Sequence, residues 1–284
     1  APLTVSGGNF TLAFDRATGY LCTYVVNGTS MLGNGGTLKP NFWRAVTDND
    51  MGAGLQKRYK AWRNPAIRLL SLQGVKTKTG AQVVATYEMP DVKARLMLTY
   101  SVAKDGQLKV TEQMTTDPTA KVSNLFRFGM RLELPYDMDK TEFYGHGPIE
   151  NYSDRCTSQN IGIYSQTADE QFFPYIRPQE SGTKTGIRWW NQTNASGAGF
   201  RIVADAPFSA SALHYSIADL DEGEAKQQRH SEQVPKSQFT ELCVDKVQTG
   251  VGGVDSWSRK AEAIKSYRVP YQDYTFTFWL IPLK

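Results

Sequence analysis

The sequence has few cysteines and no apolar run long enough to cross a membrane, so no membrane partner is predicted. The three cysteines, Cys22, Cys156 and Cys243, are odd in number and far apart, which excludes the dense disulfide framework of small secreted domains. Cys22 and Cys243 stand in apolar, strand-like runs, and we expect both to be buried thiols. The histidines show no metal-ligand spacing with one another or with a cysteine, so no metal site is predicted.

A strong charge of either sign is also missing. The chain has 32 basic and 28 acidic residues, a net charge of +4, and its densest basic run is Lys57-Arg58-Tyr59-Lys60, which we interpret as a solvated face. A nucleic-acid partner is therefore not expected. The sequence contains no phosphate-binding loop and no dinucleotide fingerprint, so no cofactor is predicted. The start lacks both the pattern of a signal peptide and an initiator Met, which indicates a processed N-terminus or a piece of a longer chain.

Aromatic residues, by contrast, are abundant, at 12% of a 284-residue chain. They suit both β-strands and contacts with carbohydrate. Alternating apolar residues separated by turn residues predict strands, and Asn27-Gly28 and Asp105-Gly106 are hairpin signals. The expected strands cover residues 10–14, 20–26, 83–89, 95–102, 107–115, 125–134, 199–204, 208–213, 239–245 and 274–280. We predict an all-β fold of stacked antiparallel sheets with only short helices.

Helical signals are sparse. Leu55, Tyr59 and Trp62 recur at helical spacing before Asn64-Pro65 ends the run. Ser216 and Asp219 form a capping-box pattern ahead of a polar segment that extends to about Arg229. Residues 116–122 are the best candidate for a boundary, but nothing there justifies dividing the chain, so residues 1–284 are expected to form a single domain.

The most informative stretch runs from Gly250 to Trp257 and reads Gly-Val-Gly-Gly-Val-Asp-Ser-Trp. Glycines permit sharp turns and close approach of the backbone to a partner. Asp255 and Ser256 offer short hydrogen-bonding side chains, and Trp257 offers a flat apolar face for a sugar ring. By composition alone, a tight turn with a core Trp is the more frequent explanation.

Three other segments, residues 41–52, 144–155 and 174–182, complete a set of four motifs in order along most of the chain. The set resembles the C-terminal domain, or small chain, of bacterial β-galactosidases of the large multidomain glycoside hydrolase family 2 type. That family's patterns are approximately F-x-R-A-P-T-D-N-D-x-G, Y-G-x-G-P-x-E-N-Y-x-D-R, P-Y-x-x-P-Q-E-x-G and M-G-x-G-G-x-D-S-W. Two positions depart from them: Val46 replaces Pro and Thr249 replaces Met, and the second change could alter the packing beneath the Trp257 loop.

The resemblance implies a β supersandwich related to galactose mutarotases. It implies that the domain packs beside a catalytic (β/α)₈ barrel and that Trp257 forms an apolar platform for the galactoside substrate, with Asp255 and Ser256 as weaker contacts. It places no catalytic residue in this chain, so the isolated chain is expected to be inactive. The parent's compartment stays open between bacterial cytoplasm and periplasm, and an oligomeric parent is compatible with the sequence.

The loops also contain carboxylates, and retaining glycosidases need two of them about 5–5.5 Å apart. Their proximity in sequence to arginines favours structural ion pairs instead, because a carboxylate held by Arg is a poor general acid. The carboxylates are Asp48, Asp50, Glu150, Asp154, Glu180 and Asp255, and the arginines are Arg44, Arg155, Arg177 and Arg188.

Two functions from other classes stay open. One is an independent aldose epimerase with a His acid and a carboxylate base, for which only His146, His214 and His230 are available; His146 is expected to be exposed and incidental. The other is a stand-alone carbohydrate-binding module. Trp43, Trp189, Trp190 and Trp279 are interpreted as core or interdomain packing, and an exposed apolar patch is expected where other domains would contact this one.

Overall fold

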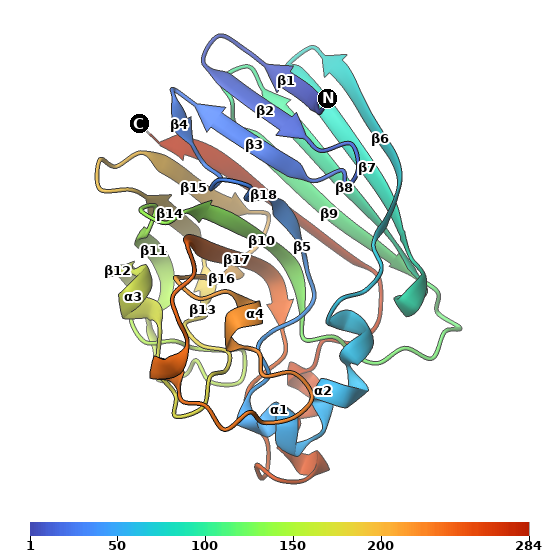
Figure 1. Ribbon diagram of the computed structural model, residues 1–284, viewed down its shortest axis with the longest axis vertical. Helices are drawn as coiled ribbons and strands as arrows, with labels where there is room; N and C mark the ends of the chain where they lie inside the picture. Colours follow the sequence, from blue (N-terminus) through green and yellow to red (C-terminus); the bar gives the residue numbers. More distant parts are fainter. Residues whose placement is uncertain (284) are drawn as a thin grey trace.

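The computed structural model describes residues 1–283, and its main feature is a pair of antiparallel sheets packed face to face (Figure 1). The predicted all-β sandwich is therefore confirmed. The first sheet has the order β1-β2-β3-β5-β10-β17-β16-β13, with β4 paired to β3. Its strands are β1 (Leu3–Ser6), β2 (Phe10–Phe14), β3 (Leu21–Val26), β4 (Thr29–Ser30), β5 (Leu38–Asn41), β10 (Arg127–Pro135), β13 (Lys184–Ile187), β16 (Phe208–Leu213) and β17 (Phe239–Gln248).

The second sheet has the order β12-β11-β14-β15-β18-β9-β8-β7-β6. Its strands are β6 (Arg68–Thr77), β7 (Gly80–Met89), β8 (Ala94–Ala103), β9 (Leu108–Thr116), β11 (Lys140–Gly147), β12 (Asn160–Thr167), β14 (Trp189–Thr193), β15 (Gly199–Ala204) and β18 (Tyr274–Leu283). Each sheet combines strands from both sides of residues 116–122, so these residues do not separate one sheet from the other.

The strands form because apolar residues alternate along them and face the space between the sheets. In β8, for example, Leu96, Leu98 and Tyr100 are buried while the residues between them are more exposed. Both predicted hairpin turns are present: Asn27 and Gly28 adopt positive φ, and so does Gly106. Residues from both sheets form one large hydrophobic core.

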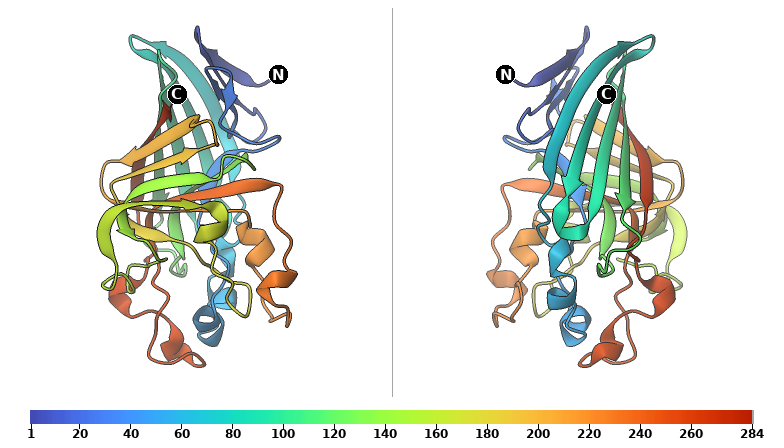
Figure 2. Two further views of the ribbon diagram at one scale, coloured as in Figure 1. Left: turned by 90° about the vertical axis from the view of Figure 1, so that its left-hand side faces the viewer. Right: turned by 90° about the vertical axis from the view of Figure 1, so that its right-hand side faces the viewer.

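The helices are all short, and those within residues 48–58 lie at the end of the sandwich away from both chain termini (Figure 2). The helices are α1 (Asp48–Gly52), α2 (Leu55–Arg58), α3 (Ala168–Gln171) and α4 (Ile217–Leu220), with 3₁₀ turns at Lys60–Trp62, Pro90–Val92, Ser231–Gln233, Arg259–Ala261 and Lys265–Tyr267. No helix in the described part of the chain is long and apolar enough to span a membrane.

Four details differ from the sequence-based expectation. The capping box at Ser216 is present, but helix α4 stops at Leu220 and the predicted extension towards Arg229 is wrong, because the backbone of Asp221 is already extended. Strand β10 begins at Arg127 rather than at residue 125. Residues 144–147, expected in a loop, are the end of β11. Cys243 is buried as predicted, whereas Cys22 is only half-buried.

Candidate functional site

The glycine-rich segment after β17 forms a loop that presents Trp257 to solvent. Trp257 is 79% exposed, and Val254 in the same loop is 76% exposed. Trp257 is therefore not the core tryptophan that composition alone would favour. Trp43, Trp62 and Trp190 are buried, whereas Trp189 and Trp279 are half-buried, so Trp257 is the tryptophan most open to a partner.

The glycines serve close approach rather than unusual backbone angles, since none of the three has a positive φ. A Cβ at Gly250 would lie 2.3 Å from a carboxylate oxygen of Asp154, and one at Gly253 would lie 2.3 Å from the carbonyl oxygen of Ala261. The loop also touches helix α1, where a Cβ at Gly52 would lie 2.2 Å from the carbonyl oxygen of Ser256. Side chains at these positions would push the loop off its support.

Asp154 is the main anchor of the upper part of the loop. One carboxylate oxygen accepts the N–H of Val251 at 3.0 Å and the other accepts the N–H of Gly252 at 2.8 Å. Asn49 of α1 adds a hydrogen bond from its side-chain amide to the carbonyl oxygen of Val251. The motif at residues 144–155 and the glycine loop are therefore one structural unit.

The base of the loop is held by Arg44, which is completely buried. Its guanidinium donates to the carbonyl oxygens of Thr249 and Gly250, at 2.6 and 2.9 Å, and pairs with both carboxylate oxygens of Asp50. Burial opposes the charged form of Arg44, but Asp50 outweighs it, and the net pKa of Arg44 is raised. Such a bidentate pair fixes orientation as well as charge.

Thr249, which stands where the family pattern has Met, packs beneath the loop. It is fully buried, its hydroxyl donates to the carbonyl oxygen of Leu125 at 2.9 Å, and its N–H donates to that of Phe126. The loop is thus supported by side chains of its own domain, namely those of Arg44, Asp154, Asn49 and Thr249.

Asp255 and Ser256 differ in what they offer. The carboxylate of Asp255 accepts the N–H groups of Trp257 and Ser258 and the hydroxyl of Ser258, which closes a turn just before the indole. The hydroxyl of Ser258, followed by these backbone N–H groups, lowers the pKa of Asp255. Ser256 is exposed, and its side chain makes no hydrogen bond within residues 1–283. Asp255 thus positions Trp257, while Ser256 is free to meet a ligand.

The other loop carboxylates mostly form the predicted ion pairs. The observed pairs are Asp50 with Arg44, Glu150 with Arg155, Asp48 with Arg177 and Glu180 with Arg127. Partial burial favours a higher pKa for Asp48, but hydrogen bonds from Arg177 and Gln179 lower it. The proposed pairing of Arg188 is wrong within the described residues: it contacts the carbonyl oxygen of Gly186 instead of a carboxylate.

Arg127 and Asp245, which the motifs did not indicate, form a buried pair below these loops, and Arg127 also reaches Glu180 at 3.4 Å. Burial raises the pKa of Asp245 to about 6 against the opposing effect of Arg127. The role of Asp154 as an anchor was also not predicted, since the backbone N–H groups that it accepts lie 97 and 98 residues away in the sequence. The ordered set of motifs was the one signal in the sequence that pointed to a contact between the Asp154 segment and the glycine loop.

The histidines do not form an acid–base site at the loop. His146 is half-buried with Nδ1 3.2 Å from the hydroxyl of Thr185, which corrects the expectation that it is exposed. His214 is buried, with its two ring nitrogens facing a carboxylate oxygen of Asp169 and the carbonyl oxygen of Tyr136. His230 is exposed. Among residues 1–283, no group of three or more His, Cys, Asp or Glu side chains is arranged to hold a metal ion.

Comparison with known proteins shows one family across nearly the whole chain. Residues 6–280 match the family model described as the β-galactosidase small chain. A β-galactosidase of Priestia megaterium is 35% identical over 99% of this chain, and one of Lactobacillus delbrueckii subsp. bulgaricus is 32% identical over 91%. The chain spans only 26% and 25% of the length of these two relatives.

Solved structures support the same fold assignment. A galactose mutarotase-like protein from Lactobacillus casei superimposes with a TM-score of 0.54, covering all of both chains at 12% identity. A galactose 1-epimerase from Lactobacillus acidophilus gives the same TM-score, with 99% of this chain and 93% of that one covered at 8% identity. At such low identity the likeness shows the fold alone, which is galactose mutarotase-like as expected.

Proposed function

Because the chain belongs to the β-galactosidase small chain family, we propose that it is the accessory domain of a bacterial enzyme that hydrolyses terminal β-galactosides with retention. The catalytic carboxylates would reside on a separate (β/α)₈ barrel in the same protein. In this proposal, the present chain contributes to the sugar site through Trp257 and performs no bond-breaking step itself.

The observation that carries the proposal is an exposed indole on a locked loop. The indole of Trp257 is 79% exposed and therefore packs little against residues 1–283. The backbone of its loop is nevertheless held by hydrogen bonds to Arg44, Asp154 and Asp255. A rigid support for a bare aromatic face suits a platform for the C–H face of a sugar, since little conformational freedom is lost on binding. Trp257 has no group that titrates near neutral pH, so its role is binding rather than proton transfer.

The loop carboxylates support a positioning role for this chain. Asp48, Asp50 and Glu150 are held by arginines, and Asp154 and Asp255 are occupied by backbone N–H groups. A carboxylate engaged in this way is poorly suited to protonate a leaving group. The barrel proposed as partner would therefore have to supply both catalytic carboxyl groups.

The epimerase alternative gains no support from the site. His214 is the histidine that lies beside a carboxylate, but it is 2% exposed and its second ring nitrogen faces a backbone carbonyl. Neither ring nitrogen of His214 is therefore free to exchange a proton with a substrate. A module that only binds carbohydrate shares the platform role and differs in having no catalytic partner.

The test is Trp257→Ala in the full-length protein, with Val254→Ala as a matched control in the same loop. Loss of aromatic stacking is expected to weaken galactoside binding by about 1–3 kcal/mol. The change should fall on KM for lactose and on kcat/KM, while the control stays close to the wild type. An unaltered KM in the Trp257→Ala enzyme would remove Trp257 from the site. Residues 1–284 alone are expected to show no turnover of a chromogenic β-galactoside above background.

A further inference from the structure

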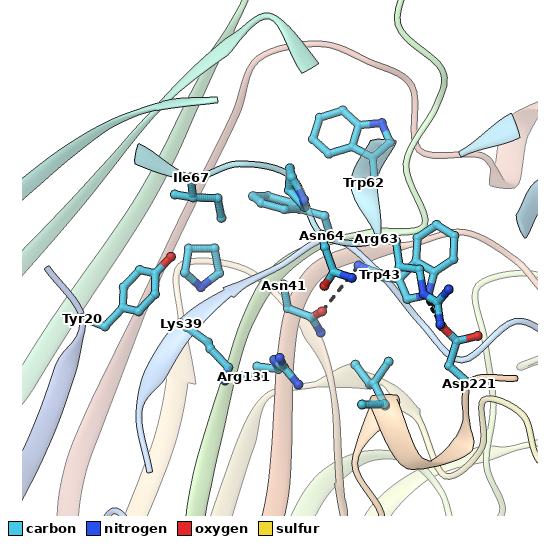
Figure 3. A pocket seen from close by; sticks show the side chains of 15 residues that line it. Tyr20, Lys39, Asn41, Trp43, Trp62, Arg63, Asn64, Ile67, Arg131 and Asp221 are labelled. Carbon is cyan, nitrogen blue, oxygen red and sulfur yellow. Dashed lines mark hydrogen bonds and ion pairs between the residues drawn. The ribbon is translucent and has the colours of Figure 1, made fainter. Parts of the chain in front are cut away.

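A pocket lies where β5 and β10 of the first sheet meet residues 62–67 and helix α4. Its volume is about 300 Å³, at the lower end of the range for small-molecule sites. Figure 3 shows Tyr20 on one side of it, Trp43 and Arg63 on the other, and Lys39 and Arg131 below. Trp257 is not part of the lining, so this pocket is separate from the glycine loop.

The charges around the pocket are balanced. Three cationic side chains line it, and each has a carboxylate partner at ion-pair distance. The pairs are Lys39 with Glu133 at 2.8 Å, Arg131 with Glu241 at 3.0 Å and Arg63 with Asp221 at 3.0 Å. The guanidinium and ammonium groups keep unused N–H donors after these bonds. A neutral ligand with many hydroxyl groups can use such donors without needing a net positive field.

Several polar groups in the lining lack a strong partner. Within residues 1–283, the side-chain amide of Asn64 and the hydroxyl of Tyr20 make no hydrogen bond with protein. Burial, with a smaller contribution from Glu112, raises the pKa of Tyr20 to about 12, so its hydroxyl stays a donor at neutral pH. Asn41 is only 5% exposed, and its amide nitrogen has the sulfur of Cys243 at 3.8 Å as its contact. Asn41 is buried and Asn64 is exposed, and amide donors that the protein leaves unused favour a ligand that can accept hydrogen bonds.

Aromatic rings complete the pocket. The indole nitrogen of Trp43 donates to Asp221 at 2.9 Å, which fixes the orientation of the ring. Phe42 and Trp62 pack against each other next to it, with ring centroids 5.4 Å apart. Since Trp43 is 5% exposed and Trp62 is fully buried, these rings shape the wall, and the half-buried ring of Tyr20 is the aromatic surface that is open to the pocket. An aromatic surface beside hydrogen-bonding groups suits the alternating C–H and O–H surfaces of a sugar.

From this combination we infer a second carbohydrate site, in which the pocket between β5, residues 62–67 and α4 binds a neutral mono- or disaccharide. Asn41 and Asn64 donate and accept hydrogen bonds with its hydroxyl groups, Arg131 and Lys39 donate to its oxygens, and the ring of Tyr20 contacts its apolar face. This site goes beyond the proposed role of the Trp257 loop and does not depend on it.

The experiment is a ligand-observed saturation-transfer NMR titration of the full-length protein with galactose, glucose and a thio-linked β-galactoside. Ala218 lines the pocket and is exposed, so Ala218→Trp blocks the pocket without disturbing the core. Ala225→Trp, an exposed position in the same region outside the lining, is the matched control. Asn64→Ala removes an amide with no protein partner, and binding is expected to weaken about 2- to 10-fold.

The expected result is that Ala218→Trp loses one component of sugar binding that Ala225→Trp and Trp257→Ala both retain. Identical titrations for Ala218→Trp and Ala225→Trp would overturn the inference. Binding of galacturonate or inorganic phosphate, but no neutral sugar, at the component blocked by Ala218→Trp would also overturn it. If Trp257→Ala binds like the wild type while Ala218→Trp loses a component, the platform role of Trp257 fails and this second site stands.

Discussion

Replacing Asp154 with Ala tests whether the glycine loop is held by this domain itself. The substitution removes acceptors from the N–H groups of Val251 and Gly252 at 3.0 and 2.8 Å. A hydrogen bond to a charged group contributes roughly 1.5–3 kcal/mol, and the exposed position of Gly252 favours the lower value. Two such bonds give about 3 kcal/mol of local stability, equivalent to a roughly 100-fold change in the opening equilibrium.

The assay is amide hydrogen exchange of the peptide containing residues 249–258, followed by mass spectrometry. Local opening controls exchange in such segments, so Asp154→Ala should accelerate exchange at residues 251 and 252 by about 100-fold. Exchange in strand β8, an interior strand of the second sheet, should not change. KM for a galactoside should rise in the full-length protein, because a loosened loop presents Trp257 less firmly.

Asp205→Ala is the matched control, since Asp205 is exposed and its side chain makes no hydrogen bond within residues 1–283. If Asp154→Ala exchanged at residues 251 and 252 like the wild type, the anchoring role of Asp154 would be refuted. If exchange rose across β8 as well, the substitution would have destabilised the whole domain, and the local reasoning would be wrong.

Two further predictions concern the core and helix α1. Burial raises the pKa of Glu112 well above its ordinary value of 4.5, so the folded protein binds the carboxyl proton more tightly than the unfolded chain does. The free energy of unfolding therefore falls as the pH rises above 4.5, where the unfolded chain loses this proton first. Denaturant unfolding at a series of pH values should therefore show Glu112→Gln to be more stable than the wild type at about pH 7 and similar near pH 4; parallel curves would contradict the assignment. Gly52→Ala should destabilise the protein by about 1–3 kcal/mol, because the added Cβ would meet the carbonyl oxygen of Ser256. Gly8→Ala is the control, since a Cβ there has open space and should cost no stability. Equal melting temperatures of the two variants would refute this prediction.

The regular part of the fold could be predicted from local pattern. Apolar alternation placed β7, β8, β9 and β18 within a few residues, because a strand with one face in the core repeats every two residues. Edge strands such as β6 and β12 were missed, since they bury little surface and their apolar residues, including Ile161 and Ile163, point to solvent. The sequence predicted the start of helix α4 after Ser216 correctly, but only the structure showed that the helix ends at Leu220.

The candidate site divides in the same way. The sequence by itself indicated the family, Trp257 as the candidate sugar contact, and ion pairing of the loop carboxylates, since motif order and opposite charges close in sequence, as in Arg44–Asp50 and Arg155–Glu150, are visible in one dimension. The pair Arg177–Asp48 joins residues 129 apart and appears only in the structure. Only the tertiary structure decided that Asp154 holds the loop, because its partners are 97 and 98 residues away in the chain. Arg44 likewise reaches carbonyl oxygens 205 and 206 residues away. Local sequence patterns specify which segments form strands and turns, but contacts of backbone N–H and carbonyl groups carry no residue identity, so only the packed sheets determine which loops meet.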